Sequence, residues 1–470
     1  MGVSESLERF FDVQEHGSSV RTEILAGVTT FLTMSYIVVV NPSILTDQPG
    51  IPGPDGIAIA GMSAGEVQSM IAVVTIIAAA TATFVMAVYA NRPFAQAPGL
   101  GLNAFFAFTV VGALGIPWQT ALAAVVVEGI IFIILTAIGA REYVIGLFPE
   151  PVKFAVGTGI GLFLAIIGLQ AMGIVVDDGT TLVTLGSVAS DPVAIISVVG
   201  LFFTFALYAR NVPGSIILGI LGTTVVGWAI TTFGPITPEA GLVAGSTSVT
   251  YDITPLAGAF VSGLAQVEAF TFALVVFTFF FVDFFDTAGT LVGVGQAGGF
   301  LDEDGNLPDI DKPLMADAIG TTVGGMLGTS TVTTYIESAT GVEEGGRTGL
   351  TALTVAVLFV LSLAIVPLAA AIPQYASHIA LVVIGVVMLR NVVDIAWNDL
   401  TQAIPAGMTI LVMPFAYSIA YGIAAGIVSY PLIKLAAGER RDVRLGHWAL
   451  AGAFVVYFVV RTGGILTAQV

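Results

Sequence analysis

Apolar residues occur in long runs along the whole chain, separated by short polar segments. Many runs are about 17–25 residues long, which is the length of helix that crosses a bilayer. They are continuously apolar rather than alternating, so the pattern predicts an all-α polytopic membrane protein and not a β-barrel. The runs cover residues 23–45, 67–90, 98–113, 117–139, 152–174, 194–209, 213–233, 263–292, 313–328, 330–345, 347–371, 376–391, 402–415, 416–434 and 446–466.

Positively charged residues divide the polar segments into two sides. Lys and Arg precede the first run and recur at alternate crossings, whereas the segments 46–66, 175–192 and 234–262 contain neither. Because cytoplasmic loops collect Lys and Arg, we predict a cytoplasmic N-terminus, with these three segments facing outward. The run at 446–466 follows fourteen others, and the sequence leaves open whether it is a further span or a helix lying against the bundle.

The order of runs repeats in the two halves of the chain. The first and eighth runs begin near Glu23 and Val261, and a broken segment follows in each half, at 97–106 (APGLGLNAFF) and 328–338 (GTSTVTTYIES). Seven spans per half is an odd number, so the second half must be inserted upside down. Paired interrupted spans are the best sequence indication of a transporter binding site. The β-branched residues 331–334 favour a short extended piece.

Composition limits the chemistry that the chain can perform. Of 470 residues, 56% are hydrophobic and 10% are charged, with no Cys and three scattered His. We therefore expect no disulfide, thiol catalysis, metal cluster or cofactor. The net charge of −18 lies mostly in loops, and we interpret it as a solvated acidic surface. The absence of a G-x-x-x-x-G-K-[ST] loop disfavours ATP-driven transport. The sequence also lacks the nucleophile–base pair that a membrane enzyme would need.

Acidic residues inside the apolar runs are the candidate functional groups, because a charge at bilayer depth is expensive and by default indicates a functional site. Asp283 and Asp286 lie three residues apart in the eighth run, and Glu337 ends the second broken segment. Residues i and i+3 share a helix face, so we expect the two aspartates to point the same way. Asp317 is interpreted as a helix-start carboxylate without a further role, and Glu128 is expected to pair within the bundle.

Five long stretches resemble the AzgA-like branch of the nucleobase–ascorbate transporter superfamily, the adenine/guanine/hypoxanthine permeases. The resemblance runs from about Phe11 to Lys434. It implies two inverted repeats of seven spans, with core and gate domains and short β-like stretches in spans three and ten. The matching stretches are EHGSSVRTEILAGVTTFLTMSYIVVVNPSIL (15–45), NRPFAQAPGLGLNAFFAFTVV (91–111), FFFVDFFDTAGTLVGV (279–294), ADAIGTTVGGMLGTSTVTTYIESATGVEEGGRTGLTA (316–352) and AIPAGMTILVMPFAYSIAYGIAAG (403–426).

The resemblance also implies how the chain is divided. The expected segments are a cytoplasmic N-terminal segment (1–22), two parts of a core domain (23–140 and 263–371), two parts of a gate domain (141–262 and 372–437) and a C-terminal apolar segment (438–470).

By the same resemblance, the chain would be a plasma-membrane secondary transporter that takes up purine nucleobases by proton symport, with a proton favoured over sodium. Asp286 and Glu337 would also carry the coupled proton. A carboxylate accepts hydrogen bonds from purine N–H groups, and an Asn amide both donates and accepts. Alternatives are an anion exchanger or channel on the same fold, or a uracil/xanthine-type permease. A homodimer is left open and no nucleic-acid partner is expected. The implied substrate-binding residues are Asn103, Asp283, Asp286, Glu337, Phe105 and Phe284.

Overall fold

The computed structural model describes residues 3–47, 56–139, 149–234, 236–237, 240–244, 249–302 and 307–462. In this part of the chain, ten helices are long and apolar enough to cross a membrane. The four other predicted spans, numbers three, nine, ten and thirteen, are shorter or broken. The ten long helices are Val20–Leu45, Ala64–Ala90, Trp118–Ala137, Glu150–Ala171, Pro192–Ala209, Ser215–Phe233, Ala269–Gly298, Gly349–Ala370, Gln374–Asp394 and Ile419–Ala436.

The first half starts at a short helix near the N-terminus, and its first span is broken between two helices. Its elements are α1 (Val3–Phe10), α2 (Val20–Met34), α3 (Ile37–Leu45), α4 (Ala64–Val85) with the π-helix η1 (Met86–Ala90), β1 (Gln96–Pro98), α5 (Leu100–Ala104) with the π-helix η2 (Phe105–Ala113), α6 (Trp118–Ala137), α8 (Glu150–Ala171), the hairpin β2 (Val175–Asp178) and β3 (Leu182–Leu185), α9 (Pro192–Ala209) and α10 (Ser215–Phe233).

The second half follows the same order, with a long helix, a second helix, a strand leading into a short helix, and then four further spans. The eighth span begins and ends later than the predicted run 263–292. The elements are α11 (Phe260–Leu264), α12 (Ala269–Gly298), α13 (Asp311–Leu327), β4 (Val332–Thr334), α14 (Ser338–Glu343), α15 (Gly349–Ser362), η4 (Leu363–Ile365), α16 (Val366–Ala370), α17 (Gln374–Ser377), α18 (Ile379–Met388), η5 (Leu389–Asp394), α19 (Leu400–Phe415), α20 (Ile419–Ala436), η6 (Arg440–Asp442) and α21 (Leu445–Thr462).

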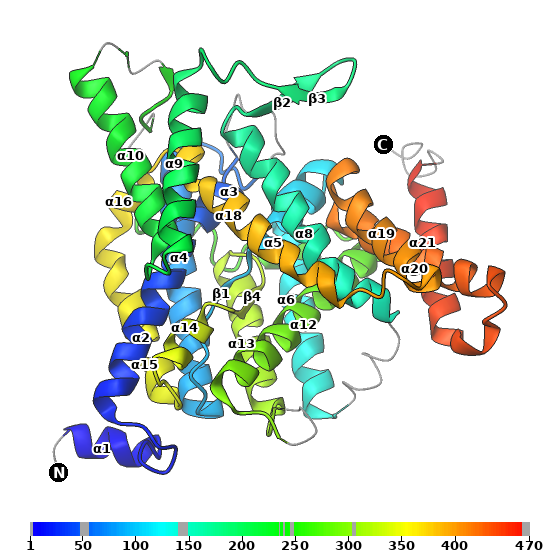
Figure 1. Cartoon of the computed structure of the whole chain (residues 1–470), viewed down its shortest axis with the longest axis horizontal. Coiled ribbons are helices and arrows are strands. Elements are labelled where there is room, and N and C mark those ends of the chain that lie inside the picture. Colours follow the sequence, from blue (N-terminus) through cyan, green and yellow to red (C-terminus); the bar gives the residue numbers. More distant parts are fainter. Residues whose placement is uncertain are drawn as a thin grey trace.

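The two broken spans meet at the centre of the molecule, where β1 and β4 form an antiparallel pair (Figure 1). Lipid cannot satisfy the free backbone groups of a broken helix, and here each break supplies the partners of the other. The pairing extends past the strands, because Gly99 N donates to Thr331 O at 3.0 Å and Tyr335 N donates to Ala95 O at 3.0 Å. A side chain at Gly99 would meet Thr333 Cγ2 at 2.6 Å, so this close approach requires glycine.

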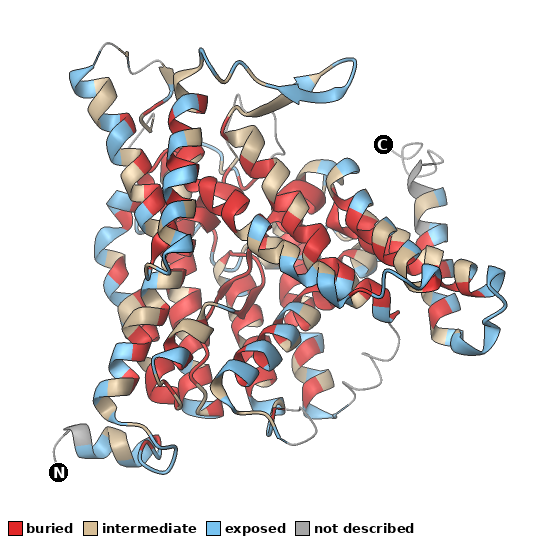
Figure 2. Cartoon of the chain, viewed as in Figure 1, coloured by how far each residue is buried: buried red, intermediate tan, exposed pale blue. Residues whose placement is uncertain are grey.

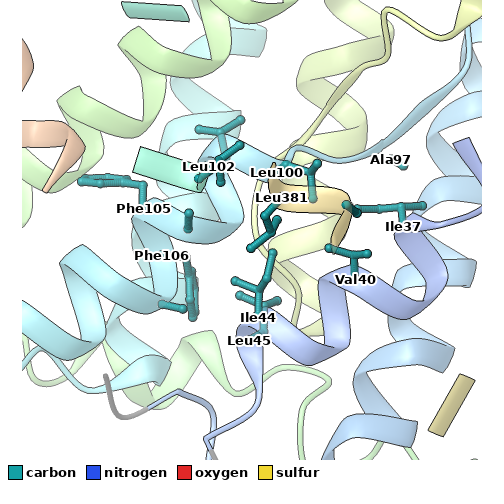
Figure 3. Close-up of a cluster of buried hydrophobic side chains, with 14 of the residues drawn as sticks. Ile37, Val40, Ile44, Leu45, Ala97, Leu100, Leu102, Phe105, Phe106 and Leu381 are labelled. Carbon is teal, nitrogen blue, oxygen red and sulfur yellow. The ribbon is translucent and has the colours of Figure 1, made fainter. Parts of the chain in front are cut away.

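The helices pack into two groups, which we call the core group (α2, α3, α4, α6 and α12 to α15) and the gate group (α8 to α10 and α18 to α20). Burial is concentrated where helices face one another, and the outer faces carry most of the exposed residues (Figure 2). Apolar side chains also join the groups. Figure 3 shows Leu381 of α18 among side chains of α3 and α5, including Ile44 and Leu100.

The apolar segment beyond residue 438 forms α21, which packs on α20. The rings of Tyr421 and Phe458 lie 5.5 Å apart, and those of Phe277 on α12 and Phe454 lie 5.9 Å apart. This helix therefore contacts both groups. The part of the predicted run at 463–466 lies outside the described residues.

Candidate functional site

Asp283 and Asp286 lie on adjoining sectors of α12, as residues three apart do, but their surroundings differ, because the first is buried and the second is exposed. Asp283 is fully buried, and its Oδ2 accepts a long hydrogen bond of 3.4 Å from Thr321 on α13. Asp286 is exposed. Three residues at 3.6 per turn leave two side chains about 60° apart, and here that angle spans the edge between a packed face and an open one.

Asp286 begins an open face of α12, defined by Asp286, Gly289 and Gly293, which are all exposed. No heavy atom lies within 4 Å of a side chain built at Gly289, and one at Gly293 would meet only Ile336 at 3.6 Å. Ile336 itself is 50% exposed although it follows β4 at the centre of the molecule. The open face therefore has unfilled space beside Gly289, and the β4–α14 turn lies next to it at Gly293.

Glu337 lies on this turn. It directly follows Ile336, the residue that a side chain at Gly293 would meet, so the turn that carries Glu337 borders the open face that begins at Asp286. Tyr36, at the break between α2 and α3, donates its hydroxyl hydrogen to Glu337 Oε1 at 2.5 Å. The carboxylate is thus positioned by the first span of one repeat and by the strand–helix turn of the other. Asp286 and Glu337 are the two predicted site residues that the structure brings together at the opening.

Asp317 lies behind the opening and accepts hydrogen bonds from three other elements. Its interpretation as a simple helix-start carboxylate did not include these contacts. It lies within α13 and is fully buried. Its Oδ1 accepts hydrogen bonds from Gln96 of β1 at 3.0 Å, from Thr287 of α12 at 2.9 Å and from Thr334 of β4 at 2.9 Å. Its position in the middle of the ninth span was the one sequence signal that pointed to such a role.

Asn103 and Glu128 attach the segment before β4 to neighbouring helices. Ser330 donates to Asn103 Oδ1, and Thr331 donates to Glu128 Oε2 at 3.2 Å. Both acceptors are fully buried, so Asn103 supports β4 from behind rather than lining the opening. The expectation that Glu128 pairs within the bundle agrees with this contact.

The aromatic candidates Phe105 and Phe284 lie in packed apolar clusters, at 0% and 2% exposure. Phe105 meets Phe279 edge-on at 4.7 Å, and Figure 3 shows it as one of a cluster of buried hydrophobic side chains. Phe284 packs against Phe132 at 5.7 Å. Neither ring is available to stack on a ligand at the open face. Phe285, which is partly buried and has Lys153 of α8 5.5 Å from its ring centre, lies nearer to that face.

A pair of carboxylates beside two interrupted spans, held between two groups of helices, defines a polytopic membrane transport protein. Comparison with known proteins gives the family. Residues 21–425 match the Permease family, and the chain belongs to this family. The resemblance carried by the five motifs is therefore confirmed. As a permease, the chain is a transporter and not an enzyme.

Two relatives cover nearly the whole chain. Adenine permease AdeP of Escherichia coli is 40% identical over 439 residues, which cover 93% of this chain and 92% of the relative. Guanine/hypoxanthine permease PbuG of Bacillus subtilis is 37% identical over 456 residues, which cover 96% of this chain and 99% of the relative.

Two solved structures share the fold. The transmembrane domain of the cyanobacterium bicarbonate transporter BicA has a TM-score of 0.58 at 15% identity, and the match covers 86% of this chain and 97% of that one. The transporter SLC26A9 has a TM-score of 0.59 at 12% identity, and the match covers 89% of this chain and 66% of that one. At these identities the likeness concerns the fold alone, and it agrees with the expected inverted seven-span repeats.

Proposed function

We propose that this protein takes up purine nucleobases across the plasma membrane by proton symport, with its N-terminus in the cytoplasm. The observation that carries the proposal is the neighbouring pair Asp286 and Glu337 at the open face of α12. A purine presents N–H donors and ring-nitrogen acceptors along one flat edge, and a carboxylate can accept from those N–H groups. The adenine and guanine/hypoxanthine permeases among the relatives support this substrate class.

In this proposal the site residues have distinct roles. Asp286 and Glu337 contact the base directly. Asp283 and Asn103 hold α12 and β4 in place from the buried side, and Phe105 and Phe284 supply rigid packing behind them. An anion exchanger on the same fold would place cationic groups at the opening, whereas two carboxylates occupy it.

Transport would follow from a rigid-body movement of the core domain (residues 23–140 and 263–371) against the gate domain (141–262 and 372–437), around the fixed site. Two features support this movement. The open face of α12 leads from Asp286 toward Gly293, and the apolar cluster with Leu381 joins the two groups at α3 and α5. Opening one side while closing the other would require this cluster to separate.

The proposal is tested by uptake of radiolabelled adenine, guanine, hypoxanthine and uracil into proteoliposomes, with and without an inward proton gradient. We expect the native protein to accumulate at least one purine, faster with the gradient, and to exclude uracil. Glu337→Gln should lose most uptake. Glu66→Gln, which alters a carboxylate that caps α4 far from the site, should not. Failure of the native protein to take up any purine would remove the proposed function.

A further inference from the structure

A second acidic pair lies behind the open face, and the proposed function does not use it. The carboxyl groups of Glu128 on α6 and Asp283 on α12 converge on the start of β4: Thr331 donates to Glu128 Oε2 at 3.2 Å, and the Thr321 hydroxyl, which is bonded to Val332 O, lies 3.4 Å from Asp283 Oδ2. Both side chains are fully buried. In the described residues, no hydroxyl or amide donates to Glu128 Oε1 or to Asp283 Oδ1. Two carboxyl groups can form a hydrogen bond with each other only when one of them carries a proton.

The neighbouring Asp317 differs in its supply of donors. Its Oδ1 accepts three hydrogen bonds of 2.9–3.0 Å, although its Oδ2, like Glu128 Oε1 and Asp283 Oδ1, receives none from the described residues. The pair receives one from Thr331 at 3.2 Å and one from Thr321 at 3.4 Å. Hydrogen bonds that a carboxylate accepts stabilise its charged form. If the three carboxyl groups hold one proton between them, Asp317 is the group best able to stay ionised, and the proton belongs to the Glu128–Asp283 pair.

The surrounding charges favour the same arrangement. The charged side chains that act on the pair are Asp317 of α13 and Asp286 of α12, and both are acidic. Across the opening, Glu337 acts on Asp286. Two ionised carboxylates buried side by side without a cation would repel strongly, so one takes up a proton. In the described part of the chain, no group of three or more His, Cys, Asp or Glu is arranged to hold a metal ion.

We propose that the Glu128–Asp283 pair, rather than Asp286 or Glu337, holds the proton that is carried together with the nucleobase. This inference rests on the proposed function. Asp283 is one helical turn from Asp286, so a proton leaving the pair passes to the Asp286 carboxylate and from there to water at the open face. The pair then carries two negative charges in place of one.

The pair is also connected to the strand that shapes the site. Thr331, which donates to Glu128, directly precedes β4, and the Thr321 hydroxyl, which lies 3.4 Å from Asp283 Oδ2, donates its hydrogen to Val332 O at 2.7 Å. A change of charge at the pair therefore acts on the backbone that leads to Glu337. This connection gives proton release a direct route to the purine-contacting carboxylate.

The test uses the full-length protein in proteoliposomes and compares Glu128→Gln with Glu23→Gln. Glu23 is a matched control, because it is also a fully buried carboxylate, but it accepts from Thr351 at 2.6 Å and from the backbone at the start of α15. We expect the proton gradient to accelerate purine uptake in the native protein and in Glu23→Gln. In Glu128→Gln the ratio of uptake with and without the gradient should fall to near one. Exchange of external labelled for internal unlabelled purine needs no net proton movement, so it should fall much less.

The inference would be overturned if a proton gradient still accelerated purine uptake by Glu128→Gln. It would also be overturned if a sodium gradient alone accelerated uptake by the native protein as much as a proton gradient does. Infrared spectroscopy provides a second readout that does not depend on transport or on the identity of the substrate. We expect a protonated carboxyl band in the native protein at neutral pH that is lost in Glu128→Gln and kept in Glu23→Gln. Absence of that band in the native protein overturns the protonated pair. If the band is present but the native protein takes up no purine, the protonated pair stands and the proposed function is removed.

Discussion

The Tyr36 hydroxyl donates a hydrogen bond of 2.5 Å to Glu337, although the two residues are 301 positions apart in the chain. Tyr36 lies at the break in the first span, and Glu337 follows the break in the tenth. The contact ties the two repeats together at the place where the proposed ligand would bind. Tyr36 is 1% exposed, so its ring is held by packing and its hydroxyl has little freedom.

Tyr36→Phe should weaken purine uptake while leaving the fold intact. A hydrogen bond to a charged group contributes about 1.5–3 kcal/mol, so we expect the KM for the preferred purine to rise roughly tenfold or more. Tyr375→Phe is the matched control, because it removes a hydroxyl that donates to Leu242 O, outside the core group. Equal KM values for Tyr36→Phe and the native protein would show that Glu337 needs no positioning by Tyr36.

Asp317→Ala should destabilise the whole core group, because it leaves the donors of Gln96, Thr287 and Thr334 without their acceptor. Each buried unsatisfied group costs about 1–3 kcal/mol, so we expect a loss of more than about 3 kcal/mol and a clearly lower Tm in detergent. Asp309→Ala provides the comparison, since Asp309 forms an exposed ion pair with Lys312. Such pairs contribute about 0–1 kcal/mol. Similar Tm values for the two variants would contradict the role given to Asp317.

Gly289 tests whether the open face of α12 is the transport path. The space beside it accepts a side chain without a clash, and Ala in a helix interior is about 0.5–1 kcal/mol more stable than Gly. We expect Gly289→Ala to raise the Tm slightly and Gly289→Leu to abolish uptake while remaining folded. Gly407→Leu is the control, because Gly407 on α19 also has no neighbour within 4 Å. Normal uptake by Gly289→Leu would place the path elsewhere.

Glu268 should make the stability of α12 depend on pH. Its carboxylate caps the helix by accepting from Phe270 N at 3.2 Å and Thr271 N at 2.7 Å. The hydrogen bond from the Thr271 side chain is the main reason that its pKa is lowered from the usual value, and the two backbone hydrogen bonds act in the same direction. Because the pKa of Glu268 is lower in the folded protein, its carboxylate stabilises the fold at pH values above its unfolded-state pKa of about 4.3. This stabilisation is lost as the pH falls through the folded-state pKa.

We therefore expect Glu268→Gln to have a lower Tm than the native protein at neutral pH. The corresponding loss in the free energy of unfolding should be no more than about 1 kcal/mol. The two Tm values should converge when the pH falls below the folded-state pKa of Glu268. A difference that persisted unchanged in acid would show that the charge of this carboxylate does not stabilise the helix.

The apolar runs were sufficient to predict the spans, because burial in lipid imposes a pattern on every residue of a helix. The broken segments at 97–106 and 328–338 were also predictable, since Pro98, Gly99 and the β-branched residues before Glu337 disfavour a continuous helix. The structure places β1 and β4 at these two positions.

The side-chain network could not be predicted in the same way. Asp317 binds Gln96, which is 221 positions away, and no local spacing encodes that contact. The separation of Asp283 from Asp286 depends on which helices pack against α12, and the i, i+3 rule does not contain that information. Phe105 and Phe284 were assigned by chemistry alone, and their burial follows from packing against Phe279 and Phe132.

The pairing of β1 with β4 has a consequence for the origin of the chain. Each repeat supplies one strand, so a single repeat in a membrane would leave the edge of its strand facing hydrocarbon. An ancestral protein with one repeat would have needed two copies inserted in opposite orientations to cover that edge. Fusion of the two genes would then have fixed both orientations in one polypeptide and freed each half to acquire its own acidic residues.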